Sequence, residues 1–208
     1  TLPVDAHAPC HDLGHGQHVL RLPRLRLDSQ QVEFGRQATG AEAISLFNRW
    51  AGQPLPLSAA CHIDDRLYVR LSGFEQGVTA AAGSLGGDLL DDGASFWQAL
   101  REQTLPFFDG DTPLWRISVP PASAALPLAG DTLVDWGGAQ RWIRSDQPAA
   151  SIREAAAAAG GHATRFRDRN RDDVFHPLPD GLLSLQQRLK ASFDPAGILN
   201  PGRMYPGL

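Results

Sequence analysis

Hydrophobic and polar residues follow no regular period over residues 1–19, and regular patterning begins after them. Over residues 20–34 apolar residues alternate with polar ones in two patches, which predicts strand structure around a turn at Asp28-Ser29. We therefore expect an irregular leader, residues 1–19, followed by one folded region, residues 20–208.

The first half of the folded region has the predicted element order β-α-β-β-α-β. Each of its two helices opens at a threonine or serine with a glutamate three residues later, the spacing of a capping box, and each ends at glycine. After the strand that ends at Phe34, we expect a helix from Thr39 (with Glu42) to Gly52, strands Leu57–Ile63 and Leu67–Leu71 around Asp64-Asp65, a helix opened by Ser72 (with Glu75) and stopped by Gly86-Gly87, and a strand Asp88–Leu90.

The second half repeats this order less completely, because a Pro- and Ala-rich segment, Pro120–Leu128, stands where a helix is expected. The other expected elements are strand Leu114–Val119, a hairpin of Thr132–Trp136 and Arg141–Ile143 around Gly137-Gly138, helix Ala149–Ala159 closed by Gly160-Gly161, and strand His162–Phe166. Together the halves predict an α+β fold. We expect one antiparallel sheet of about seven strands, built from two ferredoxin-like βαββαβ units, with the helices on one face.

Three further segments have patterns of their own. Ser95–Gln103 carries aromatic residues on one helical face before Leu105–Phe108, which is typical of a docking patch or of a satellite core. Arg165–Asp173 alternates in charge, as a solvated loop does. The last predicted helix carries an apolar stripe that we expect to be buried. Its members are Leu182, Leu185, Leu189 and Phe193.

Composition narrows the classes of protein. With 208 residues and 42% apolar content the chain can bury a substantial core. A net charge of −4 gives no electrostatic reason to expect nucleic acid or an anionic membrane surface as a partner. No apolar run is long enough for a transmembrane helix and the first residues do not resemble a signal peptide, so we expect a cytoplasmic protein without a membrane span.

The cysteines and histidines indicate neither a disulfide framework nor a structural metal site. Cys10 and Cys61 are the only cysteines, and they form no CxxC pattern. The leader holds histidines at helical spacing that would suit metal ligands, but a proline and two glycines interrupt any helix there. These histidines are His7, His11 and His15, with Cys10 and His18 beside them. We expect no metal, with a site in the leader as the alternative.

No complete catalytic motif is visible, since the sequence has no GxSxG, HExxH, P-loop or strand-linked GxGxxG. His162 follows two glycines at the start of a strand, where its imidazole beside Arg165 could orient a carboxylate and accept a proton; a structural role is the alternative. Arg116, Arg141 and Arg144 lie on or beside strands, where an inward guanidinium can bind a carboxylate. We take His162, Arg165 and Arg116 as candidate substrate-binding residues, with His162 also the candidate catalytic residue.

The last sixteen residues, FDPAGILNPGRMYPGL, place an Asn-Pro-Gly-Arg turn directly after the last helix. Asn200 offers amide donors and a carbonyl acceptor, Gly202 lets the backbone approach a ligand closely, and Arg203 is a permanent cation. Taken alone, this segment is as consistent with a plain C-terminal turn as with a binding site.

The pattern FDP-x-GI-x-NPGRMYP resembles the C-terminal signature of FAD-linked oxidases of the vanillyl-alcohol oxidase type. Four upstream segments resemble the E subunits of bacterial glycolate oxidases, and the resemblance covers residues 20–208. These segments are FWQALREQTLPFF (Phe96–Phe108), LWRISVP (Leu114–Pro120), DWGGAQRWIRS (Asp135–Ser145) and GGHATRF (Gly160–Phe166).

The resemblance implies the cap, or C-terminal, domain of an FAD-binding subunit of glycolate oxidase, whose chemistry is hydride transfer from a 2-hydroxy acid to flavin. Asn200, Gly202 and Arg203 would contact the flavin or its phosphates from the cap side. The family's amino-terminal FAD-binding domain has no counterpart in this sequence, so we expect FAD to bind weakly or not at all to this chain alone and the chain alone to be inactive.

The resemblance also implies partners. These are a D-type flavin subunit and an iron–sulfur F-type subunit, through which the chain could associate peripherally with the inner membrane. The histidine-rich metal motif of the D subunit has no counterpart here, so the 2-hydroxy acid is expected to be an indirect partner. The alternative function is a non-catalytic binding or assembly module with a ferredoxin-like fold.

Overall fold

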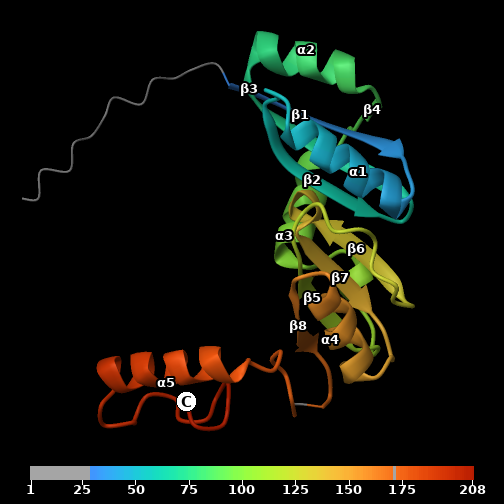
Figure 1. Ribbon diagram of the computed structural model, residues 1–208. Coiled ribbons are helices and arrows are strands. Elements are labelled where there is room, and N and C mark those ends of the chain that lie inside the picture. Colours follow the sequence, from blue (N-terminus) through green and yellow to red (C-terminus); the bar gives the residue numbers. More distant parts are fainter. Residues whose placement is uncertain (1–28, 171) are drawn as a thin grey trace, which may run out of the picture.

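The computed structural model describes residues 29–170 and 172–208. These residues form an elongated sheet with helices against it and, beside one end of the sheet, a C-terminal arm, residues 180–208 (Figure 1). The predicted leader, its histidines and Cys10, and the part of the first strand before Ser29 lie outside the described residues. Cys61, within them, is a buried free thiol.

The first unit has the predicted order of elements and the strand order β4-β1-β3-β2, which is the ferredoxin-like arrangement. Its capping box forms, since Thr39 Oγ1 accepts from the Glu42 N–H at 3.3 Å and Glu42 Oε2 accepts from the Thr39 N–H at 2.8 Å. The elements are β1 (Ser29–Gln37), α1 (Gly40–Ala51), β2 (Leu57–Ile63), β3 (Arg66–Phe74), α2 (Glu75–Leu85) and β4 (Asp88–Leu89).

The second predicted capping box, at Ser72 and Glu75, is wrong. Strand β3 continues to Phe74, which pairs with Ser29 of β1, so Ser72 is part of the ladder and not a helix cap. Its hydroxyl lies 2.8 Å from that of Ser58 on the neighbouring strand. Helix α2 begins after Phe74 with no side-chain cap. Pairing along the whole of β1 therefore outweighs the local capping signal.

The second unit is β5 (Leu114–Ser118), β6 (Asp131–Asp135), β7 (Gln140–Arg144), α4 (Ala149–Ala158) and β8 (His162–Arg167), with the short 3₁₀ turn η2 (Trp136–Gly138) between β6 and β7. No helix forms over residues 120–128, as predicted. The units join where His62 of β2 pairs with Val134 of β6, giving one antiparallel sheet. Its order is β4-β1-β3-β2-β6-β7-β5-β8, which is eight strands where about seven were expected, with the two-residue β4 at one edge.

The prediction that the helices share one face is wrong for α3 (Gly93–Glu102). Helices α1, α2 and α4 pack on the face that carries Leu67, here called the α1 face. Helix α3 and the following turn η1 (Pro106–Phe108) pack on the opposite face, here called the α3 face, where Phe96 stacks on Tyr68 at 4.0 Å. The aromatic face of α3 is the reason, because it buries Trp97 against Cys61. Of the two expectations for this segment, the satellite core is confirmed.

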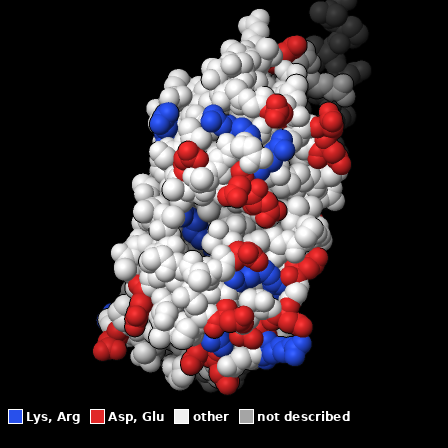
Figure 2. Space-filling model, turned by 90° about the vertical axis from the view of Figure 1, so that its right-hand side faces the viewer, with Lys and Arg blue, Asp and Glu red and all other residues white. Residues whose placement is uncertain are grey.

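The C-terminal arm consists of α5 (Asp180–Phe193) and the chain that returns along it, and it stands apart from the sheet (Figure 1). The predicted burial of its apolar stripe is wrong, because no described residue buries these four side chains. The exposed fractions are 42% for Leu182, 53% for Leu185, 57% for Leu189 and 80% for Phe193. Among the described helices, none combines the length and the apolar character that a membrane crossing requires. Charges of both signs are interspersed on the face drawn in Figure 2.

Candidate functional site

A cavity of about 710 Å³ opens on the α3 face of the sheet. Strands β2 and β3 contribute residues to it, α3 lines one side, and the end of β6 with the η2 turn lines another. We call it the α3 cleft. The side chains in it that can bind or react are Arg70, Arg101, Asp135, Trp97, Trp136, Gln31 and Gln98.

Arg70 is held in place at this cleft. Its Nε donates to Ser58 Oγ at 3.1 Å, and its guanidinium carbon lies 5.5 Å from the ring centre of Trp97. Trp97 is buried, and its indole Nε1 has no hydrogen-bond partner among the described residues. Arg101, one turn further along α3, is exposed and pairs with Glu102 at 2.8 Å. Such an exposed ion pair is weak, so the Arg101 guanidinium remains available to an anion.

Asp135 places a carboxylate in the same cleft, at the end of β6. One of its oxygens accepts from the Trp136 N–H at 2.7 Å. Burial raises the pKa of Asp135 above its ordinary value. Trp136 has a left-handed backbone, with φ of 52°, and the residue is 65% exposed. Positive φ is uncommon for a bulky residue and occurs preferentially at functional sites.

Arg116, one of the predicted substrate-binding residues, borders this cleft through Trp136. Its guanidinium carbon lies 5.5 Å from the centre of the Trp136 ring, and its Nε donates to Gln140 Oε1 at 2.7 Å. The cleft therefore combines cations that can bind a small carboxylate with a carboxylate whose raised pKa suits it to accept a proton.

Sequence reasoning missed Arg70, Arg101 and Asp135, although two signals pointed to the first two. Alternation in β3 puts Arg70 on the same face as Tyr68, and Trp97 and Arg101 lie four residues apart on one face of a helix. What the sequence did not reveal is that α3 crosses to this face and brings the two arginines to one cavity.

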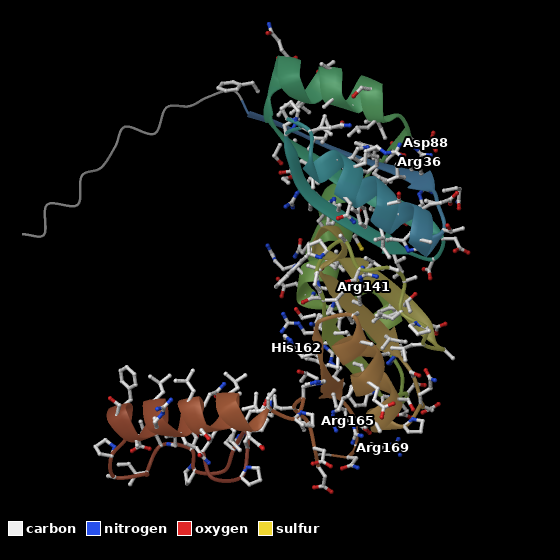
Figure 3. All side chains as sticks on the ribbon, in the orientation of Figure 1. Arg36, Asp88, Arg141, His162, Arg165 and Arg169 are labelled. Atoms are coloured by element: carbon white, nitrogen blue, oxygen red, sulfur yellow. The ribbon has the colours of Figure 1, made fainter. Side chains whose placement is uncertain are left out.

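The structure does not bring together His162 and Arg165, the predicted substrate-binding pair (Figure 3). They lie three residues apart on β8, so their side chains point to opposite faces of the sheet. The Arg165 side chain is mostly buried, with its guanidinium carbon 5.1 Å from the ring centre of Trp115 and its Nε 3.4 Å from the Asp168 carboxylate. Arg165 is thus in a packing position. The solvated loop predicted over Arg165–Asp173 begins only after Arg167, where β8 ends.

His162 is exposed, and its ring centre lies 6.5 Å from that of His176. His176 holds the chain after β8 against that strand, since its Nδ1 accepts from the Ala163 N–H at 3.3 Å. Desolvation lowers the pKa of His176, and the nearby Arg153 and His162 act in the same direction. No cluster in the described part of the chain has enough histidine, cysteine or acidic residues to hold a metal ion.

The Asn-Pro-Gly-Arg turn lies in the C-terminal arm, where Asn200 and Arg203 line a groove of about 660 Å³ with Leu189 and Phe193 of α5. Asn200 and Gly202 both have left-handed backbones, with φ of 45° and 68°. Neither the Asn200 amide nor the Arg203 guanidinium makes a hydrogen bond to another described residue. The predicted cofactor-binding residues are therefore together and accessible.

Asp194 holds this turn in shape, a role that sequence reasoning missed. Its carboxylate accepts from Lys190 Nζ at 2.5 Å and from the Leu199 and Ile198 N–H groups at 2.9 and 3.1 Å. These contacts, that with Lys190 foremost, lower the pKa of Asp194 to about 2. The sequence feature that could have revealed this role is the position of Asp194 directly after α5, where a carboxylate can accept hydrogen bonds from otherwise free N–H groups.

Comparison with known proteins supports the resemblance described above. The chain is 44% identical over 187 residues to "Glycolate oxidase subunit GlcE" of Escherichia coli (strain K12). The shared stretch is 90% of this chain and 51% of the relative, so the chain spans about half the length of the curated relative that it matches. No family profile and no solved structure matches the chain. The expected closeness to glycolate oxidase E subunits is confirmed.

Proposed function

We propose that this chain is the cap, or substrate-side, part of an E-type subunit of a glycolate oxidase. The observation that carries the proposal is the 44% identity to GlcE, a glycolate oxidase subunit by name, over 90% of this chain. The α3 cleft adds to it, because its arginines suit a small carboxylate such as glycolate.

This proposal departs from the expectation that the 2-hydroxy acid is only an indirect partner, because the α3 cleft offers arginines and a carboxylate of its own. In it Arg70 and Arg101 bind the glycolate carboxylate, and Asp135 accepts the proton of the glycolate hydroxyl group as the α-carbon loses hydride. Trp97 and Trp136 exclude water from the reacting carbon. FAD, if bound beside the cleft, would supply the two-electron acceptor for this hydride, and Asp135 would hold the hydroxyl proton. Arg116 positions Trp136 and does not touch substrate.

The C-terminal turn fits one edge of that cofactor. Asn200 and Arg203 offer free side-chain donors, which suit a phosphate or the polar edge of a flavin. The N–H of Gly202 already donates to the Leu208 carbonyl, but the space beside this glycine is open and would let a ligand approach closely. The described residues supply no further cradle of backbone donors near them. We therefore propose that Asn200, Gly202 and Arg203 complete a flavin site whose larger part belongs to a different region of the assembled protein.

The exposed stripe of α5 supports the same arrangement. Four large apolar side chains in a row on a helix are unusual on a free surface and are typical of an interface. Since the chain spans about half the length of GlcE, we propose that a flavin-binding region corresponding to the other half covers this stripe. The D-type flavin and iron–sulfur F-type subunits are the proposed further partners.

Glycolate-dependent reduction of a dye by the complete subunit, assembled with its partners, tests this function. Arg70→Gln and Arg101→Gln should each raise KM for glycolate about tenfold or more, because a charge-assisted contact to the carboxylate is lost. Asp135→Asn should lower kcat and flatten the acidic limb of the pH profile. Arg49→Gln, an exposed change on the α1 face, is the control and should leave both constants unchanged.

Two failures of this experiment mean different things. An unchanged KM in the arginine variants would refute the role of the α3 cleft but leave membership of the complex intact. Assembled protein that reduces no dye with glycolate would refute the proposed function. The exposed stripe of α5 would then favour the second candidate, a non-catalytic assembly module with a ferredoxin-like fold.

A further inference from the structure

A second cavity lies on the α1 face, where the second unit has no helix between β5 and β6. Irregular chain covers this part of the sheet and leaves a space of about 190 Å³. We call it the Arg141 cavity. Its walls come from α1, from the irregular chain and from β5, β6 and β7. Most of the side chains in these walls are aliphatic: Ile44, Ile117, Leu126, Leu128, Val134 and Ile143.

One charged side chain, Arg141, lines this apolar space. It is only 5% exposed and lies at the level where the two units meet (Figure 3). Its Nε donates to the Gly138 carbonyl at 2.7 Å and its Nη2 to the Ser123 carbonyl at 2.9 Å. Within the described residues, Nη1 makes no hydrogen bond and no carboxylate lies within ion-pair distance of the guanidinium.

A buried guanidinium without a counter-ion is expensive to keep. Carbonyl dipoles replace only part of the hydration that the cation loses on burial. Desolvation accordingly lowers the pKa of Arg141, although an arginine remains protonated. Arg144, on the same strand, makes more hydrogen bonds than Arg141, since it donates to the carbonyls of Thr112, Asp109 and Gly110.

We propose that the Arg141 cavity binds a small monocarboxylate with an apolar chain. Its carboxylate would accept from the Arg141 guanidinium, and its chain would lie against the aliphatic walls. The volume is suitable, because an apolar protein cavity of about 150 Å³ is large enough for benzene. Water is a poor occupant by comparison, since the aliphatic walls offer it few partners. This site lies on the opposite face from the α3 cleft and does not depend on the proposed function.

Titration calorimetry of the 208-residue chain with hexanoate, and with hexan-1-ol as the neutral ligand of equal chain length, tests the proposal. Hexanoate should bind about tenfold or more tightly than the alcohol, because only the carboxylate pairs with Arg141. Arg141→Gln should abolish this preference, and Arg141→Lys should keep part of it, since an ammonium retains the charge but not the planar donor pair.

A matched pair of variants keeps the test decisive if Arg141→Gln does not fold. Ala125 and Ala124 are neighbours and both are exposed, but only Ala125 lines the cavity. Ala125→Phe should block hexanoate binding, whereas Ala124→Phe should leave it unchanged, with circular dichroism showing that both are folded. Equal affinity for hexanoate and hexan-1-ol in the unaltered chain, or equal binding by the two phenylalanine variants, would overturn the proposal.

Discussion

Asn200 and Arg203 sit in a turn that other residues hold in place. Because neither side chain makes a hydrogen bond to another described residue and both are exposed, Arg203→Ala and Asn200→Gly should change the free energy of unfolding of the chain by less than about 0.5 kcal/mol. Glycine is the suitable replacement at Asn200, since the backbone there has φ of 45°. Chemical denaturation of the isolated chain measures this.

The same two substitutions should act differently in the complete, assembled subunit, where we propose that the turn contacts flavin. There they should lower the flavin content of purified protein, because a charge-assisted contact is lost. The opposite pattern, a large loss of stability with unchanged flavin content, would show that the turn is structural and that the proposed cofactor role is incorrect.

The shape of this turn depends on Asp194. Its pKa is lowered to about 2 in the folded chain, so its ionised form is stabilised by folding. The contribution of the ionised Asp194 carboxylate to the stability of the fold is fully present above the ordinary pKa of aspartate, near 3.8. This contribution is lost as the pH falls toward 2. The protection of the Ile198 and Leu199 amides against hydrogen exchange, relative to the unfolded chain at the same pH, should therefore fall over this range.

Asp194→Asn provides the control for this titration. The variant should show faster exchange at neutral pH, and its protection should not change further between pH 4 and pH 2, which are about the bounds of the expected titration. If the unaltered chain keeps its protection down to pH 2, the carboxylate does not hold the turn. The difference between the two proteins isolates Asp194 from other carboxylates that titrate in the same range.

At the scale of elements, α5 differs from the other long helices in having no buried residue. Leu185→Ser and Leu189→Ser should therefore cost the isolated chain less than about 0.5 kcal/mol of unfolding free energy. Leu114→Ala, at a fully buried leucine of β5, should cost about 2–5 kcal/mol. Thermal and denaturant unfolding of the three variants compares them directly, and a stripe variant that loses as much as Leu114→Ala would contradict the structure.

The elements that were predictable from sequence are those whose signals are local. The Thr39 capping box, the Asp64-Asp65 turn and the glycines after α2 and α4 each determine an end of an element through the backbone next to them. The errors concern long-range contacts. Ser72 has a capping pattern, but pairing between β1 and β3 decides its structure. The stripe of α5 has the pattern of a buried helix face but is exposed among residues 29–170 and 172–208.

The candidate site was less predictable for the same reason. The Asn200 turn follows one helix in sequence, so its residues were found together. The α3 cleft combines Arg70 of β3, Arg101 of α3 and Asp135 of β6, and these meet only because α3 packs on the face opposite to α1. No periodicity in one segment specifies which face of a sheet a helix will cover.

At the scale of the whole molecule, the two ferredoxin-like units meet edge to edge through β2 and β6, and the α3 cleft includes residues of both units. The sheet and α3 therefore form the α3 cleft without residues of the C-terminal arm. The arm, by contrast, presents its apolar stripe and its free donors together. A surface of this kind is consistent with docking on a further region that holds most of the cofactor.

We therefore expect the isolated 208-residue chain to bind FAD more weakly than about 1 μM, since that affinity corresponds to roughly 8 kcal/mol, far more than one exposed turn can supply. Calorimetry with FAD measures this. The same chain should not reduce a dye with glycolate, because hydride transfer requires a bound acceptor next to the α3 cleft. Submicromolar binding, or turnover that survives repurification without partners, would mean that the described residues already contain a complete flavin site and that the arm is not an interface.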